Sequence, residues 1–416
     1  MIWHIAKKEI LENLTTYRFA ILPGMLVILM TVSLIVSYGD YELRLENFNL
    51  NHPAAHSSNV MIPPTPLSIF AKGVDAHLGR LYYIKFSGIE VQAVEESVNR
   101  LFSLFSVPDG LFIIKVMLSL IALLFSFDVI TSEKEQGTLK LTLTSGANKF
   151  ALLFGKLLGR FVLVAGPFSV LFLASAIIVS ILPDVPVSGE YWSKIVFILV
   201  SSAVYIFSFI AIGLLLSSLV HHNSTSLVLC LAAWVFLVFV IPQMGMTIAR
   251  SIAEVPPSER VEMQNRLATI RGIFDRIHQD PTWTPQGFKR MSDEINAANS
   301  QALESYRPKL LKNINITKTI VRLSPAGALT FLLTDATDCG LFEETRFKDA
   351  VAGFASRNFD VINGVKNGTI EDFRYERTSL QDILNASGYT DIGIIIIVSL
   401  LCVTLSMISI AEYDPR

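Results

Sequence analysis

The chain has 416 residues, of which 51% are hydrophobic and 17% are charged, and its mean hydropathy is +0.50. This apolar content is high, and this charge content low, for a soluble globular protein. The formal net charge of −2 gives no basis for nucleic-acid binding, and three cysteines without a C-x-x-C spacing give no disulfide framework and no metal or redox motif of that type. Composition therefore favours a membrane protein, and we expect an all-α, polytopic fold.

Residues 1–18 predict a short amphipathic helix. Charged residues lie mostly on the side opposite the apolar ones. Trp3 and Tyr17 suit the depth of the lipid headgroups, so we expect this helix to lie in the membrane interface. The apolar residues at helical spacing are Ile2, Trp3, Ala6, Ile10, Leu14 and Tyr17.

Six apolar segments are long enough to cross a bilayer. They are residues 19–38, 111–130, 161–182, 195–220, 226–248 and 391–411. Basic residues precede the first segment and crowd the loop between the second and third, which places the N-terminus and that loop in the cytoplasm. Six spans bring the C-terminus back to the same side. The sequence thus predicts a multi-pass protein of the cell (inner or plasma) membrane with both termini cytoplasmic.

Two longer polar segments then fall outside the cytoplasm. Residues 39–110 form a loop in which 89–105 predict a helix leading into the second span. Residues 249–390 are long enough for a domain of their own, and we expect it to be mainly helical. Helices are predicted at 258–274 and around 288–311. The apolar segment 327–334 is too short to span and is expected to dock against the membrane surface or the outer ends of the helices.

Charges are dense and mixed in the cytoplasmic segment 131–160. It opens with Glu-Lys-Glu-Gln-Gly-Thr-Leu at 133–139, continues through a small-residue turn at 145–147, and enters the third span after Gly155-Lys156. Motif, spacing and flanking spans together resemble the ABC-2 type (type V) permeases of ABC transporters. The long segment 249–390 indicates a branch with an enlarged extracytoplasmic domain before the last helix. The turn lacks the proline that is common at this point in relatives.

The resemblance implies specific roles for these segments. The N-terminal helix corresponds to an elbow helix, and the loop after the second span to a coupling helix that sits in a groove of a separate ATPase subunit. The glutamates are expected to pair with basic groups of the ATPase and the leucines to supply apolar contact. The residues assigned to ATPase coupling are Glu133, Glu135, Gly137, Thr138, Leu139, Leu141, Leu143 and Lys156. The alternative is an ordinary charged loop that anchors two helices at the membrane surface.

The implied function is the membrane subunit of an ATP-driven exporter. A P-loop needs Gly-x-x-x-x-Gly-Lys-Ser/Thr, but Gly155-Lys156 is followed by Leu157, so the chain is not expected to hydrolyse ATP or to be an enzyme by itself. We expect no cofactor, no catalytic residue and no metal on this chain, with ATP and magnesium held by the partner ATPase. Further expected partners are a second permease chain, identical or related, membrane lipid and an extracytoplasmic protein.

Two other functions compete with transport. One is a complex that transmits ATPase motion to an extracytoplasmic partner through residues 249–390 without moving a substrate. The other is a membrane-anchored binding module with no ATPase. The predicted spans carry almost no charge beyond Lys115 and Asp128, which argues against a proton-relay antiporter. An ATPase subunit encoded beside this gene would remove the binding module, and transport in vesicles would separate the first two functions.

Overall fold

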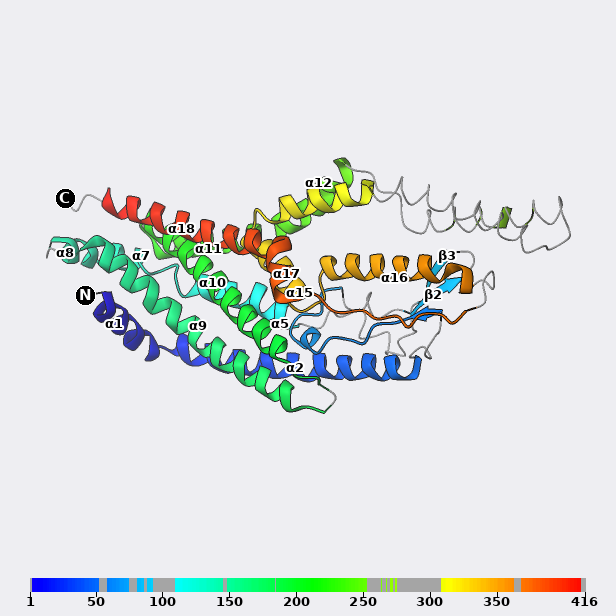
Figure 1. Ribbon diagram of the computed structural model, residues 1–416. Coiled ribbons are helices and arrows are strands. Elements are labelled where there is room, and N and C mark those ends of the chain that lie inside the picture. Colours follow the sequence, from blue (N-terminus) through cyan, green and yellow to red (C-terminus); the bar gives the residue numbers. More distant parts are fainter. Residues whose placement is uncertain are drawn as a thin grey trace.

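The computed structural model describes residues 2–51, 58–74, 81–85, 88–92, 109–144, 148–183, 185–252, 308–362 and 368–412, together with residues 263, 267, 270, 271 and 274. The described chain is mostly helical and elongated (Figure 1). Both termini lie at one end of a helix bundle, which we call the base. A smaller unit with α16 and the strands lies toward the other end, which we call the distal end (Figure 1).

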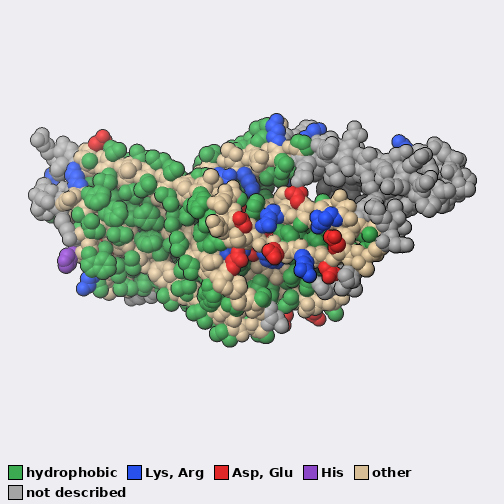
Figure 2. Space-filling model, viewed as in Figure 1, with side chains coloured by type: hydrophobic (Ala, Val, Ile, Leu, Met, Phe, Trp, Pro, Cys, Tyr) green, Lys and Arg blue, Asp and Glu red, His purple; other side chains and the backbone are tan. Residues whose placement is uncertain are grey.

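Within the described residues, five helical segments are long and apolar enough to cross a membrane. They are Ile21–Asn51 within α2 (Tyr17–Asn51), α9 (Lys149–Ile181), α10 (Gly189–Leu219), Asn223–Ile252 and Leu380–Ala411. The fourth consists of α11 (Asn223–Val235), η3 (Phe236–Val240) and α12 (Ile241–Ile252), and the fifth of α17 (Leu380–Ile383), η4 (Leu384–Gly388) and α18 (Tyr389–Ala411). All five overlap predicted spans, and hydrophobic side chains cover most of the bundle face in Figure 2.

The segment predicted as the second span is shorter than expected. Its helical part runs from Gly110 to Leu124 through α5 (Gly110–Phe112), η2 (Ile113–Leu118) and α6 (Ser119–Leu124). At 1.5 Å per residue it is about 22 Å long, against roughly 30 Å of hydrocarbon in a bilayer. Residues 125–130 form turns whose apolar side chains are buried in the bundle, so their hydropathy reflects protein packing and not lipid. The prediction of one continuous helix over 111–130 is wrong at its end.

Helix α10 occupies the centre of the bundle. It packs against α18, α9, α6 and α15, and more of it is buried than of any other candidate span in the described residues. Its aromatic side chains Tyr205 and Phe209 are fully buried beside each other. Helix α15 (Pro325–Ala336) begins at the N-cap Ser324 and packs against α10 and α18, so the apolar segment 327–334 docks among the ends of the long helices.

The expectation of an all-α fold is wrong at the distal end. A three-stranded antiparallel sheet has the order β1 (Asn59–Val60), β2 (Leu81–Lys85), β3 (Gly88–Gln92). Strand β3 replaces the start of the helix predicted over 89–105, whose other residues lie outside the described ones. Aromatic residues and isoleucine dominate β2, and β3 contains the β-branched residues Ile89 and Val91; residues of both kinds favour strands.

The sheet and α16 (Leu341–Ile362) share a small hydrophobic core of their own. We call β1, β2, β3, α16 and residues 368–379 the distal subdomain. Charged side chains gather over this part of the surface in Figure 2. Its core consists of Val60, Ile62, Tyr82, Ile84, Phe347, Val351 and Phe354, with Phe373 and Tyr375 packed against them.

The remaining helical predictions are described in part. Residues 263, 267, 270, 271 and 274, from the predicted helix 258–274, are helical. Of the helix predicted around 288–311, residues 308–311 are described, and they open a helix over 308–321. A short 3-10 helix, η1 (Pro66–Ile69), packs against α2. At the base lie α1 (Ile2–Leu14), α7 (Thr131–Glu135) and α8 (Thr138–Thr144).

Candidate functional site

The N-terminal helix α1 packs along the first part of α9 at two glycines. A Cβ atom on Gly155 would lie 2.7 Å from Cβ of Ile5, and one on Gly159 would lie 2.8 Å from Cβ of Glu9. Both distances are shorter than side chains tolerate, so these glycines let the two helices approach closely. Trp3 stays exposed on another side of α1. This arrangement suits a helix with one side on the bundle and one side in the membrane interface.

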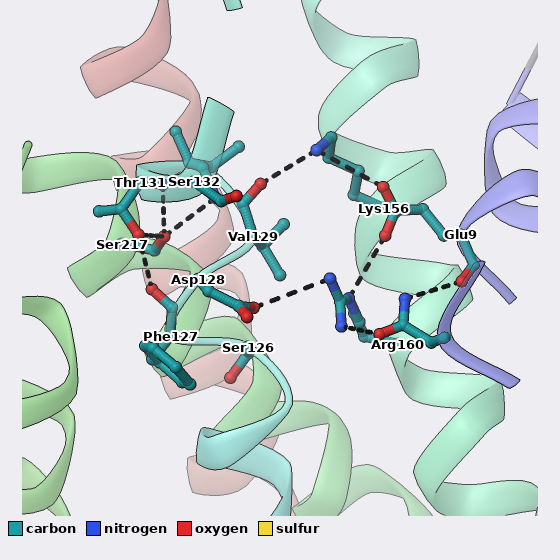
Figure 3. Close-up of polar contacts among 12 residues, drawn as sticks. Glu9, Ser126, Phe127, Asp128, Val129, Thr131, Ser132, Lys156, Arg160 and Ser217 are labelled. Atoms are coloured by element: carbon teal, nitrogen blue, oxygen red, sulfur yellow. Dashed lines mark hydrogen bonds and ion pairs between the residues drawn. The ribbon is translucent and has the colours of Figure 1, made fainter. Parts of the chain in front are cut away.

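A buried lysine on α9 is the centre of the polar contacts at the base (Figure 3). Lys156 is 4% exposed, and its Nζ lies 2.7 Å from Oε1 of Glu133 and 3.5 Å from Oε1 of Glu9. It also donates a hydrogen bond of 3.0 Å to the backbone carbonyl of Val129. A buried cation needs such compensation because it has lost its water. Lys156 thus joins α9 to α1, to α7 and to the turn before α7.

One helical turn further on, Arg160 makes a parallel set of contacts (Figure 3). Its Nε lies 3.4 Å from Oε2 of Glu9, and its Nη2 lies 3.8 Å from Oδ1 of Asp128. Its Nη1 donates a hydrogen bond of 2.5 Å to Oδ1 of Asn13. The carboxylate of Glu9 therefore lies between Lys156 and Arg160, and each of its oxygens faces one cation.

The turn before α7, residues 125–130, is also held to α10 by a buried serine (Figure 3). Oγ of Ser217 accepts hydrogen bonds from the backbone N–H groups of Ile130, at 3.0 Å, and Thr131, at 3.1 Å. These are N–H groups at the start of α7, which have no partner within their own helix. Ser226 of α11 adds a hydrogen bond of 2.6 Å to the carbonyl of Phe127.

Charged side chains of α7 contact the facing ends of α10 and α11. Lys134 donates hydrogen bonds from Nζ to the carbonyls of Ser218 and Val220, where the helix dipole of α10 is negative. Burial lowers the pKa of Lys134. Glu135 accepts hydrogen bonds of 2.8 Å from the backbone N–H and from the side-chain amide of Asn223, at the positive end of α11. Lys134 and Glu135 thus each carry the charge that the dipole of the facing helix end favours.

Gly137 turns the chain between α7 and α8. Its φ is +71°, in the left-handed region that glycine adopts most readily. The hydroxyl of Thr138 donates a hydrogen bond of 3.4 Å to the carbonyl of Glu133. On α8, Leu139 is 0% exposed and belongs to the main core, whereas Leu141 is 70% exposed. The side chain of Leu143 lies outside the described residues.

The structure brings most of the predicted coupling residues together, yet it divides them into two groups. Glu133, Leu139 and Lys156 are largely buried in contacts with the rest of the chain, whereas Glu135, Thr138 and Leu141 are exposed. Sequence reasoning assigned no role to Glu9 or Ser217. A signal existed for Glu9, since it is a lone carboxylate on the side of α1 that carries Ile2 and Ala6. None existed for Ser217, one of many small residues in its span.

The long apolar helices and the fastened polar loop at the base define a polytopic helical membrane protein with a surface helix beside the bundle. The sequence profile of the ABC-2 family transporter proteins matches residues 3–407. The chain therefore belongs to this family of ABC transporter permeases. Over 125 residues it is 31% identical to the probable ABC transporter permease protein NosY of Stutzerimonas stutzeri. That match covers 30% of this chain and 45% of the relative.

Proposed function

We propose that the chain couples ATP hydrolysis by a separate ABC ATPase subunit to the export of a substrate across the cell membrane. The observation that carries this proposal is the contrast between α8 and the adjacent α7. Leu141 is exposed on a short helix, and the adjacent α7 is fastened to α1, α9, α10 and α11. An element that receives force needs a surface exposed to its partner and firm attachment to what it moves.

Each attachment gives the movement of α8 a route into the bundle. A push on α8 reaches α7 across Gly137, and from α7 it passes through Glu133 to Lys156 on α9. Through Ser217 and Asn223 it reaches the base of α10 and α11. Two such permease chains, identical or related, would enclose the substrate pathway, with the base and both termini on the cytoplasmic side.

In this proposal Glu133 and Glu135 act within the chain. Their carboxylates are engaged by Lys156 and by Asn223, so they hold the loop rigid while other residues contact the ATPase. Leu141 and the exposed polar residues near it, such as Thr138, form the surface offered to the partner. ATP and magnesium belong to the ATPase subunit, and the chain itself supplies no catalytic group.

The test is whether the chain associates with an ABC ATPase subunit in a pull-down. Leu141→Asp places a carboxylate in the proposed contact and costs on the order of a few kcal/mol if that contact excludes water. We expect this variant to be expressed and folded as the parent is, and to lose the ATPase in a pull-down. Leu50→Asp is the matched control, because Leu50 is 75% exposed at the far end of α2. Retention of the ATPase by Leu141→Asp, with parental turnover, would contradict the proposal.

A further inference from the structure

Helix α10 differs from the other candidate spans in being uninterrupted. Among the described residues, α2 contains Pro23, α9 contains Pro167, and Asn223–Ile252 contains both Pro242 and the π-helical η3. Leu380–Ala411 contains the π-helical η4. Prolines and π-helical turns are the usual places where helices bend. Helix α10 has neither, and it is packed on several sides by α18, α9, α6 and α15.

At the base, α10 is tied to the loop that precedes α8. Ser217 accepts the backbone hydrogen bonds of Ile130 and Thr131, and Lys134 caps the carbonyl end of the helix. Close packing reinforces these contacts, since a Cβ atom on Gly213 would overlap Oγ of Ser126. Any displacement of this loop along the axis of α10 therefore acts directly on the helix.

At its distal end the same helix is tied to the distal subdomain by a buried lysine. Nζ of Lys194 lies 2.7 Å from Oδ1 of Asp338 and donates a hydrogen bond of 2.8 Å to the carbonyl of Thr378. Lys194 and Asp338 are almost completely buried. Asp338 lies between α15 and α16, and the hydroxyl of Thr378 donates to Glu343 of α16. Lys194 thus contacts the segment between α15 and α16 and the segment 368–379 that leads back to α17.

We propose that α10 is a rigid strut that carries the displacement of residues 125–144 to the distal subdomain. We call these residues, which include α7 and α8, the 125–144 loop. Lys194 is the positioning residue at the distal end of α10. The two attachment points, Ser217 and Lys194, are about 35 Å apart at 1.5 Å per residue. This inference rests on the proposed function, because the displacement is driven by the partner ATPase. It adds that the distal subdomain moves in step with nucleotide turnover.

The central experiment measures that movement in the complex with the ATPase. Spin labels are placed on Ser356→Cys, which is exposed on α16, and on Ile181→Cys, which is exposed at the end of α9. The three native cysteines are buried and are not expected to react. We expect the distance between the labels to change between the nucleotide-free and ATP-bound complexes of the parent.

The decisive variant is the double substitution Lys194→Met with Asp338→Asn. It removes the ion pair without leaving an uncompensated buried charge, and asparagine tolerates the positive φ of 58° at position 338. We expect this variant to keep the ATPase and its basal turnover and to lose the nucleotide-dependent distance change. The matched control is Arg322→Met with Asp391→Asn, because that pair joins the 308–322 segment to α18 and makes no contact with Lys194.

The outcomes distinguish failure of the strut proposal from failure of the proposed coupling function. A parent complex that hydrolyses ATP without any distance change would overturn the strut, and so would a double variant that keeps the parental change. Loss of the change in the control pair as well would also overturn it, because the effect would then follow from losing any buried ion pair. Failure of the parent to bind the ATPase would refute the proposed function, and this is measured separately by pull-down.

Discussion

Lys156 and Glu133 form an ion pair with 2.7 Å between Nζ and Oε1, and this pair joins α9 to the loop at the base. Glu133→Gln should remove the negative charge and leave the buried ammonium group with weaker compensation from Glu9. We expect a loss of about 1–3 kcal/mol in the free energy of unfolding. Thermal unfolding in detergent measures it. Glu12→Gln is the control, because Glu12 pairs with Lys8 on the exposed side of α1, where an ion pair is worth roughly 0–1 kcal/mol.

The two leucines of α8 should respond in opposite ways to the same substitution. Leu139→Asp places a carboxylate in the core and should destabilise the protein by several kcal/mol, because a buried charge without a partner is costly. Leu141→Asp should leave the unfolding temperature within the error of the parent value. Expression level and thermal unfolding of both variants give the comparison. Equal stability of the two variants would show that α8 is not packed as described.

Loss of the Ser217 hydroxyl should weaken the attachment of the 125–144 loop to α10 far more than loss of an exposed serine hydroxyl. Ser217→Ala leaves two buried backbone N–H groups, those of Ile130 and Thr131, without their acceptor. An unsatisfied buried donor costs about 1–3 kcal/mol, so the loop should loosen from α10. Limited proteolysis of the 125–144 loop should become faster. Ser193→Ala, at an exposed position of the same helix, is the control and should be cleaved at the parental rate.

Stability at the distal end of the bundle should depend on pH through Asp335. Burial raises the pKa of this carboxyl group to about 6, with the nearby Asp391 adding to the effect and Lys318 opposing it. An unfolded Asp has a pKa near 3.9, so the folded protein binds this proton more tightly than the unfolded chain does. The resulting penalty is fully present above about pH 6 and disappears as the pH falls toward 4.

Asp335→Asn should therefore raise the free energy of unfolding at pH 8, by up to about 3 kcal/mol. The gain should shrink to about half at pH 5, because the parent carboxyl group is then mostly protonated in the folded state. Unfolding curves of both proteins at the two pH values test this. The control is Glu376→Gln, at an exposed position of the distal subdomain, which should change the free energy of unfolding little. A gain that is the same at pH 5 and pH 8 would rule out titration of Asp335 as its cause.

Local patterns predicted what local physics decides. Hydropathy located five segments that form long apolar helices in the structure, because about twenty consecutive apolar residues match the thickness of a bilayer when they are helical. It misread residues 125–130, because burial against α10 and burial in lipid demand the same side chains. It also missed the strands, because β2 and β3 are short and are stabilised by pairing with each other and, for β2, by packing against α16.

By itself, the sequence determined the membrane class, the surface helix at the N-terminus and, through the pattern at 133–139 and its flanking spans, the resemblance to ABC-2 permeases that the family match then confirmed. The tertiary structure alone decided which charges face each other. Glu133 forms an ion pair with Lys156. Lys194 forms one with Asp338, which lies 144 residues further along the chain. Such pairs depend on how separate helices pack, and a residue's own neighbours in the sequence carry no record of that. For this reason the sequence could not show that Glu133, which the resemblance assigns to contact with the ATPase, forms an ion pair with Lys156, or that Leu139 is buried in the core.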